Sequence, residues 1–287
     1  MNLPEKYTES MKMMLGDEYD SYIESFNDKR LYGLRVNNLK ISTEDFLKIC
    51  PFKLEPVPWI ENGFYYSEDD KPAKHPYYFA GLYYIQEPSA MTPANVLPVK
   101  PGDVVFDMCA APGGKSTELA SKLAGDGLLI TNDISNSRTK ALLKNVEVSG
   151  VSNLCVLNED PSKISGKFHE FFDKVLIDAP CSGEGMFRKD PVAIEEWSPE
   201  NVEICWQRQR RIISDIWACL KPGGILIYST CTYNTKEDEE NVRWIQEEFG
   251  AEMLSLDIPV EWKITGDLLG EKKLPVYHFL PHKTKGE

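Results

Sequence analysis

The sequence of 287 residues lacks any apolar run of the roughly 18–20 residues that a membrane-spanning helix needs. It also begins without the basic segment and apolar segment of a secretory signal peptide. Hydrophobic residues make up 42% and charged residues 27% of the chain, enough for a substantial core. We therefore expect a cytoplasmic protein of one large or two smaller domains, with no membrane partner.

Regularly spaced cysteines and histidines are missing too. The seven cysteines include no Cys-X-X-Cys pair, and none of the four histidines lies near a cysteine at the spacing of a zinc site. This argues against a disulfide framework and against a bound metal. We expect reduced cysteines, of which four are buried or half-buried residues of the core: Cys50, Cys155, Cys205 and Cys219.

Basic residues are in deficit. The chain has 32 Lys and Arg against 45 Asp and Glu, which gives a net charge of −13. Acidic side chains exceed basic ones both in residues 1–95 and in residues 96–287. Affinity for a phosphate backbone comes mainly from Lys and Arg. A nucleic-acid substrate therefore requires a local basic stripe, or a partner or domain outside this chain; otherwise the substrate is not nucleic acid.

The dinucleotide pattern GXGXXG and the Walker pattern are absent as well. A nicotinamide-dependent oxidoreductase is therefore disfavoured. The chain has instead the turn Ala110-Ala-Pro-Gly-Gly-Lys115, whose two glycines let a ligand approach free N–H groups at the start of a helix. A purely structural turn is the alternative interpretation of this segment.

The first 97 residues indicate a small α+β domain. Apolar residues recur at helical spacing, and turn residues at 98–102 close the domain. We expect helices at 7–15, 19–26 and 43–50, and strands at 31–37 and 59–66.

Residues 98–287 alternate between strand and helix patterns, which predicts a second domain built on a parallel sheet. Ser135 and Ser198 are expected to cap two of its helices. The expected strands are 104–107, 127–133, 153–157, 174–178, 225–229 and a late one at 275–280; the expected helices are 114–123, 135–148, one beginning at 198 and 235–249.

Reactive side chains follow three of these strands. Cys181 comes just after strand 174–178, and Cys231 comes just after strand 225–229. Ligands of open parallel sheets bind outside the carboxyl ends of the strands. We therefore expect both thiols and the glycine turn to line one crevice. A helix beginning near residue 234 would lower the pKa of the Cys231 thiol, although packed structural cysteines remain the alternative.

Three aspartates complete the expected site. Asp133 can accept hydrogen bonds from a ribose diol, and Asp160 can contact an adenine amino group, so S-adenosylmethionine is the obvious cofactor. Asp178 follows an apolar run, and partial desolvation would let it share a proton with N3 of a cytosine. A thiolate that adds to cytosine C6 makes C5 nucleophilic enough to accept a methyl group. Solvated aspartates are the alternative.

Three segments carry a resemblance to a known family: Asp107–Thr117, Lys174–Lys189 and Tyr228–Asn234. They resemble the Sun/Fmu-type RNA cytosine-C5 methyltransferases, and most of all the RsmF (YebU-like) branch that acts on small-subunit ribosomal RNA. His75–Met91 and Trp197–Glu200 also resemble that branch, and the likeness runs from about Leu31 to Lys283.

The resemblance implies an α/β, Rossmann-like S-adenosylmethionine-dependent methyltransferase fold behind an N-terminal α+β domain related to RNA-recognition modules. It implies that Cys231 is the nucleophile and that Cys181 assists product release, the reverse of the DNA enzymes, whose Pro-Cys cysteine attacks. The implied cofactor contacts are Cys109, Ala110, Ala111, Pro112, Gly113, Gly114, Lys115, Asp133, Arg138, Asp160 and Asp178.

The implied function is methylation of cytosine C5 in RNA, most of all in 16S ribosomal RNA. Transfer RNA is an alternative substrate, and a non-catalytic RNA-binding or ribosome-assembly factor is an alternative class. Members of the branch continue with a C-terminal RNA-binding domain, which we expect this chain to lack. The expected partner is RNA, and the default oligomeric state is a monomer.

Overall fold

The computed structural model describes residues 3–270 and 274–285. The chain forms two compact units that do not follow chain order. One, here called the cysteine unit, combines the chain up to Arg30 with Pro180–Arg211 and with the chain from Thr230 onward. The other, the sheet unit, combines Leu31–Ala179 with Ile212–Ser229. The division into sequence domains 1–97 and 98–287 stays a prediction.

A five-stranded parallel sheet forms the centre of the sheet unit. Its strand order is β7-β6-β5-β8-β9, with every neighbouring pair parallel. The strands are β5 (Val104–Asp107), β6 (Leu128–Asn132), β7 (Leu154–Leu157), β8 (Phe172–Asp178) and β9 (Leu220–Ser229). The apolar runs of β5 and β8 are buried because helices cover a parallel sheet. The predicted α/β fold built on a parallel sheet is confirmed.

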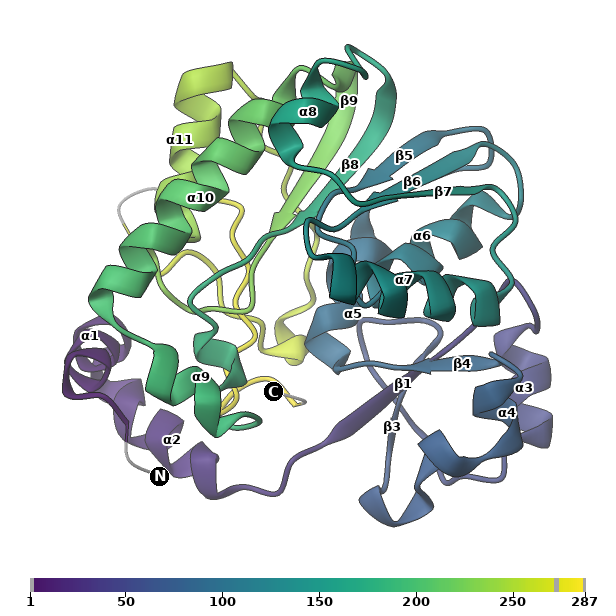
Figure 1. The fold of residues 1–287 in the computed structure, drawn as a ribbon. Coiled ribbons are helices and arrows are strands. Elements are labelled where there is room, and N and C mark those ends of the chain that lie inside the picture. The colour runs from purple at the N-terminus through teal and green to yellow at the C-terminus, as the bar shows by residue number, and fades with distance from the viewer. Residues whose placement is uncertain (1–2, 271–273, 286–287) are drawn as a thin grey trace. The chain divides into compact units, whose positions relative to one another are not determined.

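Two helices, α6 (Gly114–Leu123) and α7 (Asn136–Ser149), cover the same face of this sheet (Figure 1). Leu119 and Leu123 of α6 pack with Val105 and Leu129 of the sheet in one buried cluster. Between β7 and β8 the chain forms a short helix, α8 (Pro161–Ser165). Helix α6 follows β5 through the glycine turn at residues 108–113.

A four-stranded antiparallel sheet forms the remainder of the sheet unit. The strand order is β2-β3-β1-β4, and the helices α3 (Thr43–Ile49), α4 (Pro76–Phe79) and α5 (Pro88–Val96) accompany it. The strands are β1 (Tyr32–Val36), β2 (Glu55–Pro56), β3 (Gly63–Tyr66) and β4 (Tyr83–Ile85). The strand predicted at 59–66 is wrong in its first half, because the N–H of Gly63 bonds to the carbonyl of Ile60 in a turn.

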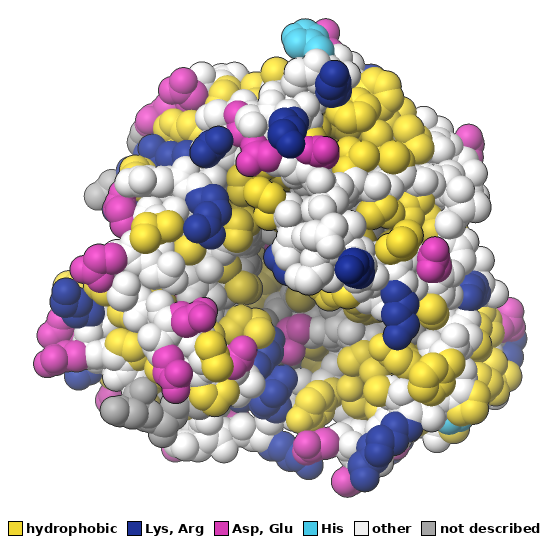
Figure 2. All heavy atoms as spheres, in the orientation of Figure 1, with side chains coloured by type: hydrophobic (Ala, Val, Ile, Leu, Met, Phe, Trp, Pro, Cys, Tyr) yellow, Lys and Arg dark blue, Asp and Glu magenta, His cyan; other side chains and the backbone are white. Residues whose placement is uncertain are grey.

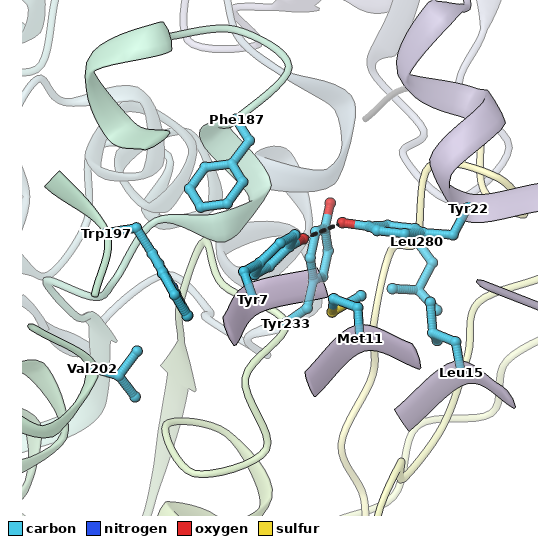
Figure 3. Packing of buried hydrophobic residues seen from close by; sticks show 9 residues of the cluster. All are labelled: Tyr7, Met11, Leu15, Tyr22, Phe187, Trp197, Val202, Tyr233 and Leu280. Carbon is cyan, nitrogen blue, oxygen red and sulfur yellow. Dashed lines mark hydrogen bonds between the residues drawn. The ribbon is translucent and has the colours of Figure 1, made fainter. Parts of the chain in front are cut away.

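An aromatic core holds the cysteine unit together. The ring of Tyr7 packs edge-on against Phe187 and Trp197, and its hydroxyl lies 2.5 Å from that of Tyr22 (Figure 3). Tyr233 and Leu280 join the same core, which therefore draws on all three chain segments of the unit, as does the partly exposed shell around it. The helices are α1 (Glu5–Leu15), α2 (Tyr19–Glu24), α9 (Pro191–Glu196), the first turns of α10 (Pro199–Trp217) and α11 (Glu239–Phe249).

Several local predictions are wrong. Residues 275–280 form no strand: His278 makes one isolated bridge with Thr265, because no neighbouring strand offers a continuous ladder there. Cys155 is exposed instead of half-buried, because it lies on β7, an edge strand of the sheet with no buried residue. β9 begins at Leu220, five residues before the strand predicted at 225–229, and the Pro222-Gly-Gly segment lies at a register shift within the β8–β9 pairing.

None of the helices in the part of the chain that the structure describes is long and apolar enough to cross a membrane. Among the same residues, no group of three or more His, Cys, Asp or Glu side chains is placed to hold a metal ion.

Candidate active site

The carboxyl ends of β8 and β9 lie side by side, paired at Asp178 and Ser229. The Ser229 hydroxyl donates to Asp178 Oδ1 at 2.8 Å, and Lys115 Nζ lies 2.7 Å from Asp178 Oδ2. The Asp178 side chain keeps 33% of its surface exposed. Lys115 comes from the glycine turn, so the ion pair joins this turn to the end of β8.

The glycine turn follows β5 and leads into α6. The N–H of Ala110 donates to the carbonyl of Asn132 at 2.8 Å, which ties the turn to the end of β6. The peptide bond between Ala111 and Pro112 is cis. Gly113 has φ +110°, a conformation that side-chain-bearing residues rarely adopt, and a Cβ there would lie 3.1 Å from Leu142. Glycine at 113 is therefore required by the backbone path itself.

Asp107, the last residue of β5, is fully buried, and Ser116 Oγ donates to its Oδ2 at 2.6 Å. Burial raises the pKa of the Asp107 carboxyl to about 7. Its second oxygen, Oδ1, has no hydrogen-bond partner in the described chain. Sequence reasoning did not single out this residue, although a carboxylate at the end of an apolar strand carries the same signal that singled out Asp178.

Asp133 follows β6 with 2% of its surface exposed. Its Oδ1 accepts from the N–H of Ser135, and its Oδ2 is buried without a hydrogen-bond partner among the described residues. The Arg138 guanidinium lies 3.4 Å from Oδ2 and donates to the carbonyl of Ala111 at 2.7 Å. Arg138 thus joins Asp133 to the glycine turn.

Asp160 caps α8: its Oδ1 accepts from the N–H of Ser162 at 3.0 Å and from the Ser162 hydroxyl at 2.5 Å. One of its oxygens is therefore occupied by a helix cap. The segment before it is fixed by Asn132, whose amide bonds the main chain of Glu159 in both directions. Asp160 consequently has a structural role in addition to any contact with an adenine ring.

The two cysteines of the sequence prediction meet in the cysteine unit. Cys181 Sγ lies 3.1 Å from Cys231 Sγ, and the N–H of Cys231 donates to Cys181 Sγ at 3.2 Å. The hydrogen bond with Cys231, followed by burial, raises the pKa of the Cys181 thiol above its ordinary value. Cys231 is exposed. The pair therefore combines an accessible sulfur with a neighbouring thiol that keeps its proton.

The helix expected next to Cys231 is wrong in position. α11 begins at Glu239, eight residues after Cys231, and turns occupy 235–238. The intervening segment is fixed by side chains: Thr230 donates to Asp238 Oδ1 at 2.7 Å, and the N–H of Lys236 bonds to Asn234. The helix after Cys231 therefore begins later in the chain than predicted.

Two buried carboxylates near the cysteines were also missed. Glu184 follows Cys181 by three residues, and Glu237 follows Cys231 by six. Burial raises the pKa of the Glu184 carboxyl to about 7 and also raises that of Glu237. The sequence gives no period or motif that marks these residues as buried.

A parallel sheet with a glycine turn after its first strand and a pair of thiols in the chain beyond its last two strands defines a protein of the methyltransferase fold. A family model described as 16S rRNA methyltransferase RsmB/F matches residues 94–287, and a model for the N-terminal domain of 16S rRNA methyltransferase RsmF matches residues 3–88. The chain belongs to this RsmB/F family.

Individual relatives are similar over most of the chain. Ribosomal RNA small subunit methyltransferase F of Pectobacterium carotovorum subsp. carotovorum (strain PC1) is 38% identical over 259 residues, which cover 86% of this chain and 54% of the relative. The chain thus spans about half the length of the curated relatives it matches.

Solved structures show the same fold. A methyltransferase homolog protein from Pyrococcus horikoshii is 31% identical, has a TM-score of 0.80, and is covered to 91% by 97% of this chain. NSun6 from Pyrococcus horikoshii, solved with SFG, has a TM-score of 0.85 at 24% identity and is covered to 95% by 99% of this chain.

Proposed function

We propose that this chain methylates C5 of a cytosine in RNA, with S-adenosylmethionine as methyl donor and 16S ribosomal RNA as substrate. The contact between Cys181 and Cys231, 3.1 Å between sulfurs, carries the proposal. Methylation at C5 needs one sulfur to add to the ring and a second group to help release the product. The names of the matching family and of the relatives support ribosomal RNA as the proposed substrate.

Cys231 is the proposed nucleophile. It is the exposed member of the pair, whereas the raised pKa of Cys181 keeps that thiol protonated at neutral pH. The Cys231 thiolate adds to C6, and the electron pair moves to C5. After methylation a base takes the C5 proton, the C5–H electron pair re-forms the C5=C6 double bond, and the bond between C6 and Cys231 breaks to return the thiolate. Cys181 is proposed to assist this release, and Asp178 to hold the base at N3.

The residues of the sheet unit fit S-adenosylmethionine. The buried Asp133 Oδ2 lacks a hydrogen-bond partner among the described residues, which suits the hydroxyl groups of a ribose. Arg138 links Asp133 to the Ala111 carbonyl of the glycine turn, and Lys115 holds Asp178. When bound, the cofactor supplies an electrophilic methyl group. Asp160 is the proposed contact of the adenine amino group.

The surface charge bears on how RNA is bound. On the face in Figure 2, Lys and Arg side chains are interspersed with Asp and Glu, with no broad field of one sign. The net charge of −13 gives little general attraction for phosphates. We propose that specific RNA binding by the whole protein uses further chain or a partner, that it acts in the cytoplasm as a monomer, and that it needs no metal.

Replacing Cys231 by Ala tests the nucleophile. We expect transfer of a labelled methyl group to 16S ribosomal RNA to fall by more than about 10³-fold, because C5 is not activated without the covalent step. Binding of S-adenosylmethionine, measured by calorimetry, should remain. Full activity of the variant would refute the assignment of Cys231, and no cofactor binding at millimolar concentration would refute a methyltransferase.

Replacing Cys181 by Ala tests product release. We expect a covalent complex between protein and RNA to accumulate and to persist on a denaturing gel, because the bond to C6 forms but breaks slowly. The double replacement with Cys231→Ala should remove the complex. A Cys181→Ala variant that turns over at the normal rate without an adduct would exclude this role.

A further inference from the structure

Two loops carry the cysteines, and two buried carboxylates lie between them. The Pro-Cys loop is residues 180–187 and the Thr-Cys loop is residues 230–237. Glu184 belongs to the first and Glu237 to the second, and both are at least 97% buried. Both loops belong to the cysteine unit. A buried carboxylate is costly unless hydrogen bonds satisfy it, so the partners of each show what it does.

Glu184 reaches from its own loop to the other. Its Oε2 accepts from the N–H of Tyr233 at 3.1 Å, and its Oε1 accepts from the Trp197 indole N–H at 3.0 Å. The two oxygens thus have different donors. One donor lies two residues after Cys231, and the other lies in the aromatic core that contains Tyr7 and Phe187.

Glu237 reaches in the opposite direction. Its Oε2 accepts from the N–H of Ser182, the residue after Cys181, at 3.1 Å and from Gln209 Nε2 at 2.7 Å. Gln209, fully buried on α10, also donates to the carbonyl of Pro180 at 3.0 Å. Asn241 in turn donates to Gln209 Oε1 at 2.8 Å. These two donors to the carboxylate meet a single oxygen.

The two contacts are reciprocal, since each loop supplies a carboxylate that binds the main chain of the other beside the cysteine. Two more bonds close the arrangement: Gly185 N–H donates to the Cys231 carbonyl at 2.9 Å, and the hydroxyls of Ser182 and Thr232 lie 2.9 Å apart. A Cβ on Gly185 would lie 3.0 Å from the Cys231 carbonyl oxygen, which shows how closely the loops approach.

We propose that Glu184 and Glu237 are positioning residues that brace the two loops and thereby hold the sulfur of Cys181 in contact with that of Cys231. Two thiols attract each other weakly, so their contact depends on what holds the backbones. For methyl transfer the inference rests on the proposed function, because the contact matters there when Cys231 leaves the ring. Neither carboxylate is proposed to touch RNA or cofactor.

The contact can be measured without any methylation. Diamide takes the two thiol hydrogens and becomes the hydrazine, while a bond forms between Cys181 and Cys231. Mass spectrometry of the linked peptides gives the rate. Alkylation of the exposed Cys155 by iodoacetamide serves as an internal reference for general thiol reactivity. The rate of disulfide formation reports how much of the time the two sulfurs are in reach.

Two isosteric variants give different expectations. The donors to Glu184 approach both of its carboxylate oxygens. Glu184→Gln keeps only one acceptor oxygen, so one of these hydrogen bonds is lost and disulfide formation should slow about tenfold. Glu237→Gln can present its oxygen to both donors and should stay within about twofold of wild type, whereas Glu237→Ala should slow about tenfold. Glu195→Gln on α9, an exposed carboxylate, is the matched control and should not change the rate.

These results decide the inference. Slower disulfide formation in Glu184→Gln and Glu237→Ala, with Glu237→Gln and Glu195→Gln near wild type, supports the brace. A rate within about twofold of wild type in Glu184→Gln overturns it, as does equal slowing in both Gln variants. If Glu184→Gln does not fold, Trp197→Phe removes one donor to Glu184 and should slow the reaction in the same direction; no slowing overturns the brace.

Steady-state methylation separates this inference from the proposed function. With the brace weakened, kcat should fall while KM for RNA and for S-adenosylmethionine stays within about twofold, because the residues touch neither. If wild type methylates no cytosine but the disulfide rates follow the expected order, the proposed function fails and the brace stands. If methylation requires Cys231 but the rate of disulfide formation is unchanged in Glu184→Gln, only the brace is refuted.

Discussion

The two cysteines at the ends of neighbouring strands have similar sequence surroundings, yet their environments differ. Cys181 Sγ accepts an N–H from Cys231 and contacts its sulfur, and these interactions together with burial raise its pKa. Cys231 is the exposed member. Because only an ionised sulfur adds to a pyrimidine, the environment favours Cys231 for attack. The residues around the thiols, more than the thiols themselves, distinguish the two.

Glu184 makes a prediction about stability and pH. Its carboxyl has a pKa raised by burial from 4.5 to about 7, so the folded state favours the protonated form. The stability that this preference contributes is complete below about pH 4.5 and is lost as the pH rises through about 7. We expect the unfolding free energy of wild type, relative to Glu184→Gln, to fall over this range by at most roughly 3 kcal/mol.

Urea unfolding of both proteins at pH 4.5, 6, 7 and 8 measures this difference. Asp107 and Asp238 also have raised pKa values, and their contributions cancel when the variant is subtracted from wild type. The charge of Glu237 helps to raise the pKa of Glu184, so this coupling is part of the measured difference. A difference that is constant with pH would mean that Glu184 has an ordinary pKa. A difference that grows in favour of wild type would mean that the pKa is lowered.

At the scale of single elements, a serine precedes both α7 and α10, but only one of the two serines caps its helix. Ser198 Oγ accepts from the N–H of Asn201 at 3.0 Å at the start of α10. Ser135 precedes α7 but makes no such bond, because Asp133 accepts the Ser135 N–H and the Ser135 hydroxyl lies against Ser137. The capping prediction is therefore confirmed for Ser198 and wrong for Ser135.

Replacing Ser198 by Ala should lower the unfolding free energy by about 1 kcal/mol, because the first turn of α10 loses an acceptor. Ser135→Ala is the matched control and should cost less than about half as much. Thermal unfolding followed by circular dichroism measures both. Equal losses in the two variants would contradict the assignment of the cap.

At the scale of the whole molecule, the cysteine unit is assembled from three distant chain segments. Helix α1 supplies Tyr7 and Met11 to a core that also contains Phe187 and Tyr233 (Figure 3). The N-terminal helices thereby support the loops that carry both cysteines. Residues far from the site in sequence should therefore affect its stability.

Met11 and Met13 provide a matched pair on α1, with 1% and 81% of their surfaces exposed. Met11→Ala should lower the unfolding free energy by about 3 kcal/mol, because a cavity is left in the core. Met13→Ala should change it by less than about 0.5 kcal/mol. Denaturant unfolding gives both values, and protease cleavage within 180–211 should rise only in Met11→Ala. Similar losses for the two would contradict this packing of α1.

Most elements could be predicted from the sequence. The strand at 104–107 agrees with β5 residue for residue, because an apolar run between turn residues fixes both ends. The predictions failed where a distant partner decides the outcome. His278 has a single bridge instead of a strand, and the Pro222-Gly-Gly segment joins β9 because β8 extends alongside it.

The sequence by itself determined the alternation of elements and the parallel sheet, and it predicted the chemically active residues, since these depend on local periodicity and on motifs. The tertiary structure decided which groups meet: Lys115 with Asp178, Arg138 with Asp133, and Cys181 with Cys231. It alone buried Glu184 and Glu237 between the two loops. Burial and long-range hydrogen bonds depend on how distant segments pack, and no local pattern encodes them.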